Sequence, residues 1–432
     1  MTGPFSTILL GVVQCLLLAT RVDAAIVFAH FMVQNAYSYD SVADWTADIT
    51  AAQAIGIDGF ALNTAVDDYE TTKYPDAFSA AEAAGFKLFI SFDMSYDWDQ
   101  EDMVTLVKTY ASSSAYYHWN GDPLVSTYDG DDEDDDFWEE FKEDLKDEGI
   151  TICLVPAFVD YQPDDESDAT EMFEDYPSID GFFNWNSWPD DDTRLSNATD
   201  LAFKEGIEAN DRTGPYIMAV SPWQFKELGG EMDWVVLADE LWKYRWEQAI
   251  LEVKPDIVEI VTWNDYAESQ YIADINPNVD LGDLAPMYVD GFTHAGWRTM
   301  AEYYISWYKT GTPPAITEDQ VIYWYRVYPK SIACSQGALP RNSDFPADAV
   351  FAFSLLKSAG TIRLTVGDST ASFDAPAGVA LGSVPFSTVD AQSPVVEIVR
   401  NGTTVKNGTG AKAISTSSCD YYNFNPLVGI VQ

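Results

Sequence analysis

The sequence contains few basic residues and very little histidine. It has 23 Lys and Arg against 70 Asp and Glu, which gives a formal net charge of −47, and only 3 His. A chain this acidic repels the phosphates of nucleic acids and of anionic membranes, so we expect neither as a partner. The histidines, His30, His118 and His294, are too scattered to suggest a zinc site, and the G-x-S-x-G elbow of serine esterases is missing. The composition therefore favours a neutral partner and a chemistry that needs no metal.

Long apolar runs are missing too, except at the N-terminus. Residues 8–20 are apolar and residues 22–24 resemble a cleavage site, so we expect residues 1–24 to be a signal peptide, although no Lys or Arg precedes the apolar stretch. A membrane anchor is the alternative, but the stretch is shorter than the roughly 20 residues of a membrane span. Because no other segment is apolar enough to cross a bilayer, we expect a secreted, extracellular protein.

Cysteine is also scarce, with 4 residues in the whole chain. Cys15 lies in the expected signal peptide, and Cys153 lies in an apolar run that predicts a buried free thiol. Cys334 and Cys419 share the C-terminal region and could form a disulfide in an oxidising compartment, although sequence alone does not decide the pairing. Three N-x-T sequons agree with secretion, although such tripeptides also arise by chance. They begin at Asn197, Asn401 and Asn407.

From residue 26 onward, short apolar runs alternate with amphipathic stretches. Eight strand–helix repeats over roughly 290 residues predict an α/β fold of the (β/α)8 TIM-barrel type. An open doubly wound sheet is the alternative, but no Gly-rich dinucleotide fingerprint follows the first strand. The expected strands are 26–31, 59–63, 87–93, 124–129, 150–158, 179–185, 216–220 and 257–263. The expected helices are 41–55, 75–84, 100–112, 137–148, 200–209, 239–253 and 296–309.

The composition and the apolar pattern of the sequence change after Gly311. Pro313 and Pro314 mark a linker, and the residues that follow are rich in Val, Thr, Ser and Gly in short alternating runs. This pattern is typical of an antiparallel β-sandwich. We therefore expect a catalytic barrel over 25–312 and a smaller β-sandwich accessory domain over 313–432, which either binds carbohydrate or braces the barrel. The clearest runs are 321–327, 350–355 and 361–366.

The strongest local signal for chemistry lies at the end of the eighth expected strand. Asp265 and Glu268 are three residues apart there, in the turn where a barrel places its reactive groups. Glycosidic cleavage needs one protonated carboxyl and one carboxylate, and the neighbouring Trp263 and Tyr266 would limit hydration and raise a carboxyl pKa. The alternative is a polar loop with a helix-capping Asp. The 14 Trp and 24 Tyr exceed what a core needs; we expect most of them to fill the core, and the surplus fits a ligand with ring-shaped units, such as a sugar.

Several separated motifs resemble glycoside hydrolase family 71, the fungal α-1,3-glucanases or mutanases. They are the segments 27–35 (VFAHFMVQN), 44–63 (ending GIDGFALN), 117–130 (YHWNGDPLVSTYDG), 182–188 (FFNWNSW) and 261–269 (VTWNDYAES). The resemblance implies a (β/α)8 barrel with a β-sandwich behind it. It also implies hydrolysis of α-1,3-glucan with inversion at the anomeric carbon and without a metal or other cofactor.

The resemblance places the catalytic carboxylates on Asp265 and Glu268. We expect Glu268 to be the general acid and Asp265 the base that activates water, with the reverse order still open. Asp129 stands where a Glu is expected in the family, and Asp93 and Asp129 are the reserve candidates for either role. The remaining side chains expected to bind substrate are His30, Asn63, Asn184, Trp185, Trp188, Trp223, Trp263 and Tyr266.

Three functions remain compatible with the sequence. The first is an endo-acting α-1,3-glucanase that works as a monomer on a neutral polysaccharide. The second is a hydrolase of another polysaccharide, such as an α-mannan. The third is a wall protein that binds carbohydrate without cleaving it, which the retained carboxylate pair argues against. The acidic runs at 130–136 and 190–192 lack the EF-hand pattern, so they indicate solvated loops rather than a calcium site.

Overall fold

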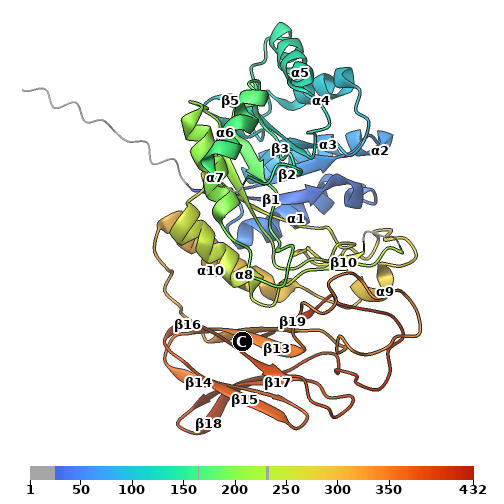
Figure 1. The fold of residues 1–432 in the computed structure, drawn as a ribbon, viewed down its shortest axis with the longest axis vertical. Helices are drawn as coiled ribbons and strands as arrows, with labels where there is room; N and C mark the ends of the chain where they lie inside the picture. Colours follow the sequence, from blue (N-terminus) through green and yellow to red (C-terminus); the bar gives the residue numbers. More distant parts are fainter. Residues whose placement is uncertain (1–24, 164, 230–232) are drawn as a thin grey trace, which may run out of the picture.

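The computed structural model describes residues 25–163, 165–229 and 233–432. The expected signal peptide, residues 1–24, lies outside this range. Figure 1 shows an α/β part in the upper half and an all-β part in the lower half, with α8 and α10 between them. Within the described residues, no helix combines the length and the apolar character that a membrane span requires.

The α/β part is built on a curled nine-stranded sheet with strand order β4-β5-β3-β2-β1-β11-β8-β7 and with β6 paired to β5. All of its strands except β4 run parallel to their neighbours. The strands are β1 (Ile26–Met32), β2 (Gly59–Thr64), β3 (Lys87–Asp93), β4 (His118–Trp119), β5 (Asp122–Tyr128), β6 (Cys153–Val155), β7 (Phe182–Asn184), β8 (Tyr216–Val220) and β11 (Ile257–Ile260).

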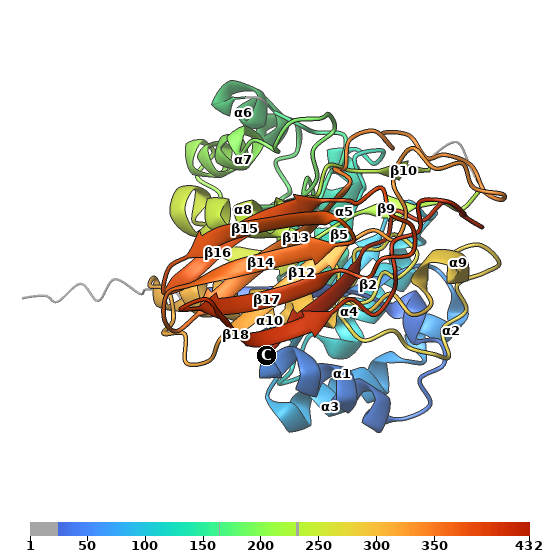
Figure 2. The ribbon, with the colours of Figure 1, turned by 90° about the horizontal axis from the view of Figure 1, so that it is seen from below.

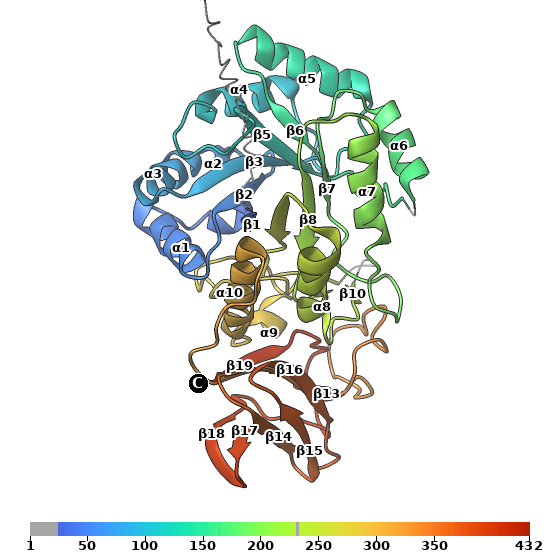
Figure 3. The same ribbon diagram turned by 90° about the vertical axis from the view of Figure 1, so that its left-hand side faces the viewer.

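A seam separates β6 from β7 in this sheet, because no ladder joins these two strands in the described part of the chain. Single backbone hydrogen bonds cross the seam, from Asp180 N to Leu154 O at 2.8 Å and from Phe183 N to Pro156 O at 2.9 Å. Pro156 has no N–H to offer a ladder, which shortens β6 relative to the expected strand 150–158. Figure 3 shows the strands splayed around the curl with the helices outside them.

Helices pack around the outside of the sheet. Ser41 and Asp44 cap the start of α1, where Ser41 N donates to Asp44 Oδ2 at 3.0 Å. Gly85 ends α3 in the left-handed region at φ 67°. The helices are η1 (Val33–Ala36), α1 (Val42–Ala54), α2 (Asp68–Thr71), α3 (Tyr74–Ala84), α4 (Gln100–Tyr110), α5 (Asp135–Asp147), α6 (Glu166–Asp175), α7 (Ala198–Ala209), α8 (Leu241–Glu247), η2 (Gln248–Val253), α9 (Pro286–Val289) and α10 (Ala295–Thr310).

The helices differ from the expected set in two ways. Helix α6 and the short helices η1, α2 and α9 were not expected, and the expected helix 239–253 is divided into α8 and the π-helical segment η2. The mixed α/β class and the extra β-sheets at the C-terminal end are confirmed.

The C-terminal part consists of two four-stranded antiparallel sheets, ordered β16-β13-β12-β19 and β15-β14-β17-β18. Figure 2 shows these two layers stacked on each other, seen from below. The strands are β12 (Gln320–Tyr325), β13 (Ala349–Leu356), β14 (Gly360–Val366), β15 (Ser369–Ala375), β16 (Gly378–Pro385), β17 (Val395–Arg400), β18 (Thr403–Thr409) and β19 (Leu427–Val431).

Strands β12 and β13 of the first sheet are buried on both faces. In β12, Val321 and Tyr323 belong to the core between the two sheets, whereas Ile322 and Trp324 belong to the core of the α/β part. Alternate residues of a strand point to opposite faces, so one strand supplies both cores. The Trp324 indole N–H also donates to Asp239 O at 3.1 Å, just before α8. The C-terminal sheets are therefore packed against the α/β part rather than tethered to it.

Cys334 and Cys419 form a disulfide in the structure, and Cys153 is a buried free thiol. The sequon residues Asn401 and Asn407 are exposed on the outer sheet, and Asn197 is half-buried at the start of α7.

Candidate active site

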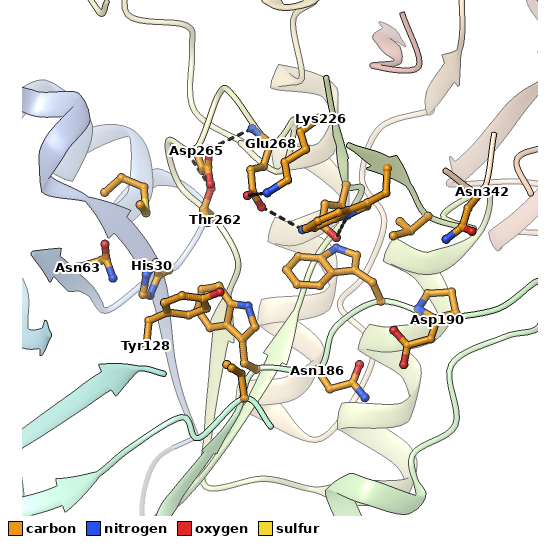
Figure 4. A pocket seen from close by; sticks show the side chains of 18 of the residues that line it. His30, Asn63, Tyr128, Asn186, Asp190, Lys226, Thr262, Asp265, Glu268 and Asn342 are labelled. Carbon is orange, nitrogen blue, oxygen red and sulfur yellow. Dashed lines mark hydrogen bonds and ion pairs between the residues drawn. The ribbon is translucent and has the colours of Figure 1, made fainter. Parts of the chain in front are cut away.

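A cavity of about 760 Å³ lies at the carboxyl ends of the parallel strands. Side chains from or just after β1, β2, β3, β5, β7, β8 and β11 line it, together with residues of the C-terminal part. Figure 4 shows the cavity from close by. The lining residues are His30, Met32, Asn63, Asp93, Tyr128, Val159, Gln162, Trp185, Asn186, Trp188, Pro189, Asp190, Gln224, Lys226, Trp234, Val236, Thr262, Asp265, Glu268, Arg341 and Asn342.

Asp265 and Glu268 are held by one turn after β11. Asp265 N donates to Thr262 Oγ1 at 2.8 Å, and Glu268 N donates to Asp265 Oδ1 at 3.1 Å. Asp265 therefore caps the turn, as a purely structural role would require. It also lines the cavity together with Glu268. In Figure 4 the two carboxyls lie side by side. The turn fixes their relative position through backbone contacts, which is what a pair of cooperating carboxyls requires.

Three donors converge on the Glu268 carboxylate. Lys226 Nζ lies 3.0 Å from Oε1, and the side-chain amides of Gln224 and Gln270 donate to Oε2 at 3.0 Å and 2.6 Å. Lys226 is carried by β9 (Phe225–Lys226), which pairs with β10 (Trp234–Val235) in a short hairpin. These donors hold the Glu268 carboxylate in one orientation on the cavity wall.

Asp265 has the opposite environment. Burial, followed by the negative charge of Glu268, raises the pKa of Asp265 to about 7. Two carboxyls this close cannot both ionise without repulsion, so the pair binds one proton around neutral pH. Asp265 therefore keeps its proton up to near neutral pH.

The raised pKa makes a prediction about stability. An aspartate in the unfolded chain titrates near 3.9, so the folded chain binds the Asp265 proton more tightly and loses stability as the pH rises from about 4 to about 7. We expect Asp265→Asn, which cannot ionise, to unfold at the same temperature as the natural chain at pH 4 and a few degrees higher at pH 8. Thermal unfolding at both pH values measures this. The same change at Asp274, whose side chain is 76% exposed, is the control. An equal shift in both variants would contradict the prediction.

His30 is oriented by a buried carboxyl. His30 Nδ1 and Glu259 Oε1 share a hydrogen bond of 2.7 Å, and both side chains are fully buried. Burial raises the pKa of Glu259, and His30 opposes this rise. The register places the two side chains on adjacent strands, since β1 pairs with β11. With Nδ1 engaged, His30 keeps Nε2 for a group in the cavity.

The loop after β7 forms the aromatic wall of the cavity. Arg245 is fully buried beneath it and donates to both Asp200 oxygens, at 2.5 Å and 2.9 Å, and to Asn186 O at 2.9 Å. Asn184 also donates to Asp200, at 2.9 Å. This network fixes the loop that carries Trp185 and Trp188.

The structure brings some of the expected site residues together and separates others. Asp129 adopts a left-handed turn conformation and accepts a hydrogen bond from Gly130 N, and Asn184 is engaged beneath the loop. Trp223, Trp263 and Tyr266 are buried and bond away from the cavity, to Phe424 O, Asp48 Oδ1 and Asp274 O. These five side chains do not line the cavity. The expected residues that do line it are His30, Asn63, Asp93, Trp185, Trp188, Asp265 and Glu268.

Several lining residues were not expected from the sequence. Lys226 had a usable signal, since it is one of few cations in an acidic chain and sits in an aromatic stretch. Arg341 and Asn342 had none, because they follow the expected domain boundary. Tyr128, Gln224 and Trp234 also line the cavity. In the described part of the chain, no three His, Cys, Asp or Glu side chains converge as a metal site would require.

Comparisons with known proteins identify the family of this chain. The model of glycosyl hydrolase family 71 matches residues 23–432. A glucan endo-1,3-alpha-glucosidase of Schizosaccharomyces pombe is 34% identical over 95% of this chain and 96% of its own length. A mutanase of Penicillium rubens is also 34% identical, over 95% of this chain and 90% of its own length. An ascus wall endo-1,3-alpha-glucanase of Schizosaccharomyces pombe is 30% identical over 94% and 98%.

Among solved structures, a family 99 endo-alpha-mannosidase from Bacteroides thetaiotaomicron has a similar fold. Its TM-score is 0.50 at 12% identity, and the likeness covers 66% of this chain and 97% of that one. The family model and the relatives together span nearly the whole chain, including the turn that holds Asp265 and Glu268. This chain is a glycoside hydrolase and belongs to glycosyl hydrolase family 71.

Proposed function

We propose that this chain is a secreted, endo-acting hydrolase that cleaves α-1,3-glucan with inversion at the anomeric carbon. Its relatives bear the names of α-1,3-glucanases and a mutanase, and one of them is named for the ascus wall. The observation that carries the proposal is the position of Asp265 and Glu268 in one turn and on one cavity. We propose a neutral wall glucan as the substrate and the extracellular space as the place of action.

We extend the proposal to the architecture. The curled sheet is a (β/α)8 barrel whose seam between β6 and β7 is bridged by single hydrogen bonds. Residues 25–312 form its catalytic domain, residues 313–432 form a β-sandwich accessory domain, and the protein works as a monomer. The support for this division is the change from parallel to antiparallel sheets at β12.

The mechanism follows from the two carboxyls. One gives its proton to the oxygen that leaves, and the other removes a proton from the water that attacks the opposite face of the sugar. We assign the acid to Glu268 and the base to Asp265. In the free enzyme the proton is on Asp265. If Glu268 is the acid, this proton must move from Asp265 to Glu268 when a glycosidic oxygen binds beside Glu268. Asp265 is then ionised and ready to activate water.

The rest of the cavity would hold the sugar. His30, Asn63 and Asp93 offer donors and acceptors to hydroxyl groups, and the Trp185 and Trp188 rings offer apolar faces to the pyranose. Burial raises the pKa of Asp93 as well, and Ser95 Oγ donates to its carboxyl at 2.6 Å.

A single experiment tests activity, linkage and stereochemistry. The chain is mixed with α-1,3-glucan, and the anomer of the first reducing end released is followed by NMR, with α-mannan as the comparison substrate. We expect the β-anomer from the glucan, because inversion of an α linkage gives a β product, and no release from the mannan. An α-anomer would refute inversion, and release from the mannan alone would refute the substrate.

A further inference from the structure

The wall of the cavity opposite the β1–β3 strand ends contains residues from the C-terminal part of the chain. We propose that Arg341 and Asn342, together with Trp234, form a glucosyl-binding wall that holds the polysaccharide beside the cleaved bond. This inference rests on the proposed function and names a part of the substrate site that neither the family motifs nor the catalytic turn supplies. The C-terminal part would then take part in substrate binding as well as brace the α/β part.

The first support is position. Arg341 and Asn342 lie in the long connection between β12 and β13, yet they line the same cavity as Asp265 and Glu268. In the view of Figure 4, Asn342 lies at the end of the cavity away from Asn63 and His30, with Lys226 between them. A polysaccharide that extends past the catalytic pair in this direction meets the connection.

The second support is that the connection is held rigidly at this place. Arg341 N donates to Asp233 O at 3.0 Å, and Val235 N donates to Arg341 O at 3.1 Å. These bonds add the connection to the edge of the β9–β10 hairpin, which carries Lys226. The disulfide between Cys334 and Cys419 ties the same connection to the segment before β19. A wall fixed in this way presents its side chains without first having to become ordered.

The third support is the state of the Arg341 side chain. Within the described residues, every other arginine donates to a carboxylate or to backbone carbonyls, but Arg341 donates to neither. This is unexpected in a chain with a formal charge of −47. Its guanidinium instead lies over the Trp234 ring, 5.5 Å from the centroid. The Asn342 side chain likewise has no protein partner in the described part of the chain.

These groups suit a sugar. A guanidinium offers several N–H donors in a planar fork that matches neighbouring hydroxyl oxygens, and an amide offers both a donor and an acceptor. Trp234 is held in place by its indole N–H, which donates to Gln224 Oε1 at 2.9 Å, and Lys226 Nζ lies 4.1 Å from its ring. The same Gln224 and Lys226 donate to Glu268, so the wall adjoins the catalytic pair directly.

The test compares Arg341→Ala and Asn342→Ala with the natural chain on a soluble α-1,3-glucan oligosaccharide. We expect Arg341→Ala to raise KM about tenfold or more, with kcat within about twofold, because hydrogen bonds from a charged donor to the bound sugar are lost. Asn342→Ala should raise KM less, and Arg341→Lys should restore part of the binding. Arg194→Ala is the matched control, since Arg194 also lies over an aromatic ring, Tyr244, but does not line the cavity.

The possible results separate the two proposals. Melting temperatures of all variants check that each one is folded. An unchanged KM in Arg341→Ala would refute the proposed glucosyl-binding wall. A fall in kcat alone would also refute it, because it would mean that Arg341 acts on the catalytic pair and not on the sugar. A natural chain that releases no sugar from the oligosaccharide refutes the proposed function itself, before any variant is compared.

Discussion

Glu268→Gln and Asp265→Asn will each lower kcat on α-1,3-glucan by at least about a thousandfold, because each removes a proton-transfer group that the reaction cannot replace. Both changes keep the size of the side chain, and in Asp265→Asn the amide oxygen can still accept from Glu268 N. Binding of the glucan should persist. Initial rates of reducing-sugar release and a pull-down on insoluble glucan measure both effects.

The assignment of roles needs a second substrate. α-Glucosyl fluoride has a leaving group that needs little help from an acid, so Glu268→Gln should recover much of the lost rate on it and Asp265→Asn should not. The reverse result would make Asp265 the acid, in line with where the proton rests in the free enzyme. Asp274→Asn is the control for both substrates, because its exposed carboxylate lies away from the cavity. A rate near that of the natural chain in either active-site variant would remove that residue from the mechanism.

Breaking the buried ion pair beneath the aromatic wall should have the largest effect on stability. Arg245→Met leaves the Asp200 carboxylate buried without its cation, and we expect the free energy of unfolding to fall by about 3–5 kcal/mol. Both side chains are fully buried, so water cannot replace the lost donors. Denaturant unfolding followed by tryptophan fluorescence measures the loss.

Two controls isolate the charge. The double variant Arg245→Met/Asp200→Asn removes both charges and should recover part of the loss, which a double-mutant cycle quantifies. Arg298→Met breaks a pair in which the Asp274 carboxylate is 76% exposed, so water can solvate the remaining charge and the loss should be about 1 kcal/mol. Equal losses in Arg245→Met and Arg298→Met would show that burial of the pair does not matter.

Much of the α/β part could be predicted from the sequence. The expected strands 87–93 and 216–220 coincide with β3 and β8, because each is an uninterrupted apolar run between helix signals. Helix α6 was missed although Ala169, Met172 and Phe173 have helical spacing and Asp165 caps its start. The helix was not predicted because most of its residues are polar or acidic and only a narrow apolar stripe is buried.

The candidate site was predictable in part. The sequence indicates which residues follow the strands, but it does not indicate which way their side chains point. Asp265 and Glu268 follow a strand that a barrel pattern locates, so their position could be inferred. Trp263 lies in the same turn, but its indole turns outward to Asp48, and no pattern in the sequence indicates this direction. Arg341 reaches the cavity only through the packing of the C-terminal sheets, a long-range contact that local periodicity does not encode.

Strands β12 and β13 have one face in each of two cores, and this constrains how such an enzyme can be rebuilt. A chimera that took its C-terminal sheets from a relative would also have to take the matching helices α8 and α10. Otherwise apolar side chains at the interface between the two parts would be exposed to water. Such a chimera would also replace Arg341 and Asn342, which line the cavity beside Asp265 and Glu268. The α/β part and the C-terminal sheets therefore have to be exchanged together, because exchanging one alone would require a redesign of the apolar interface between them.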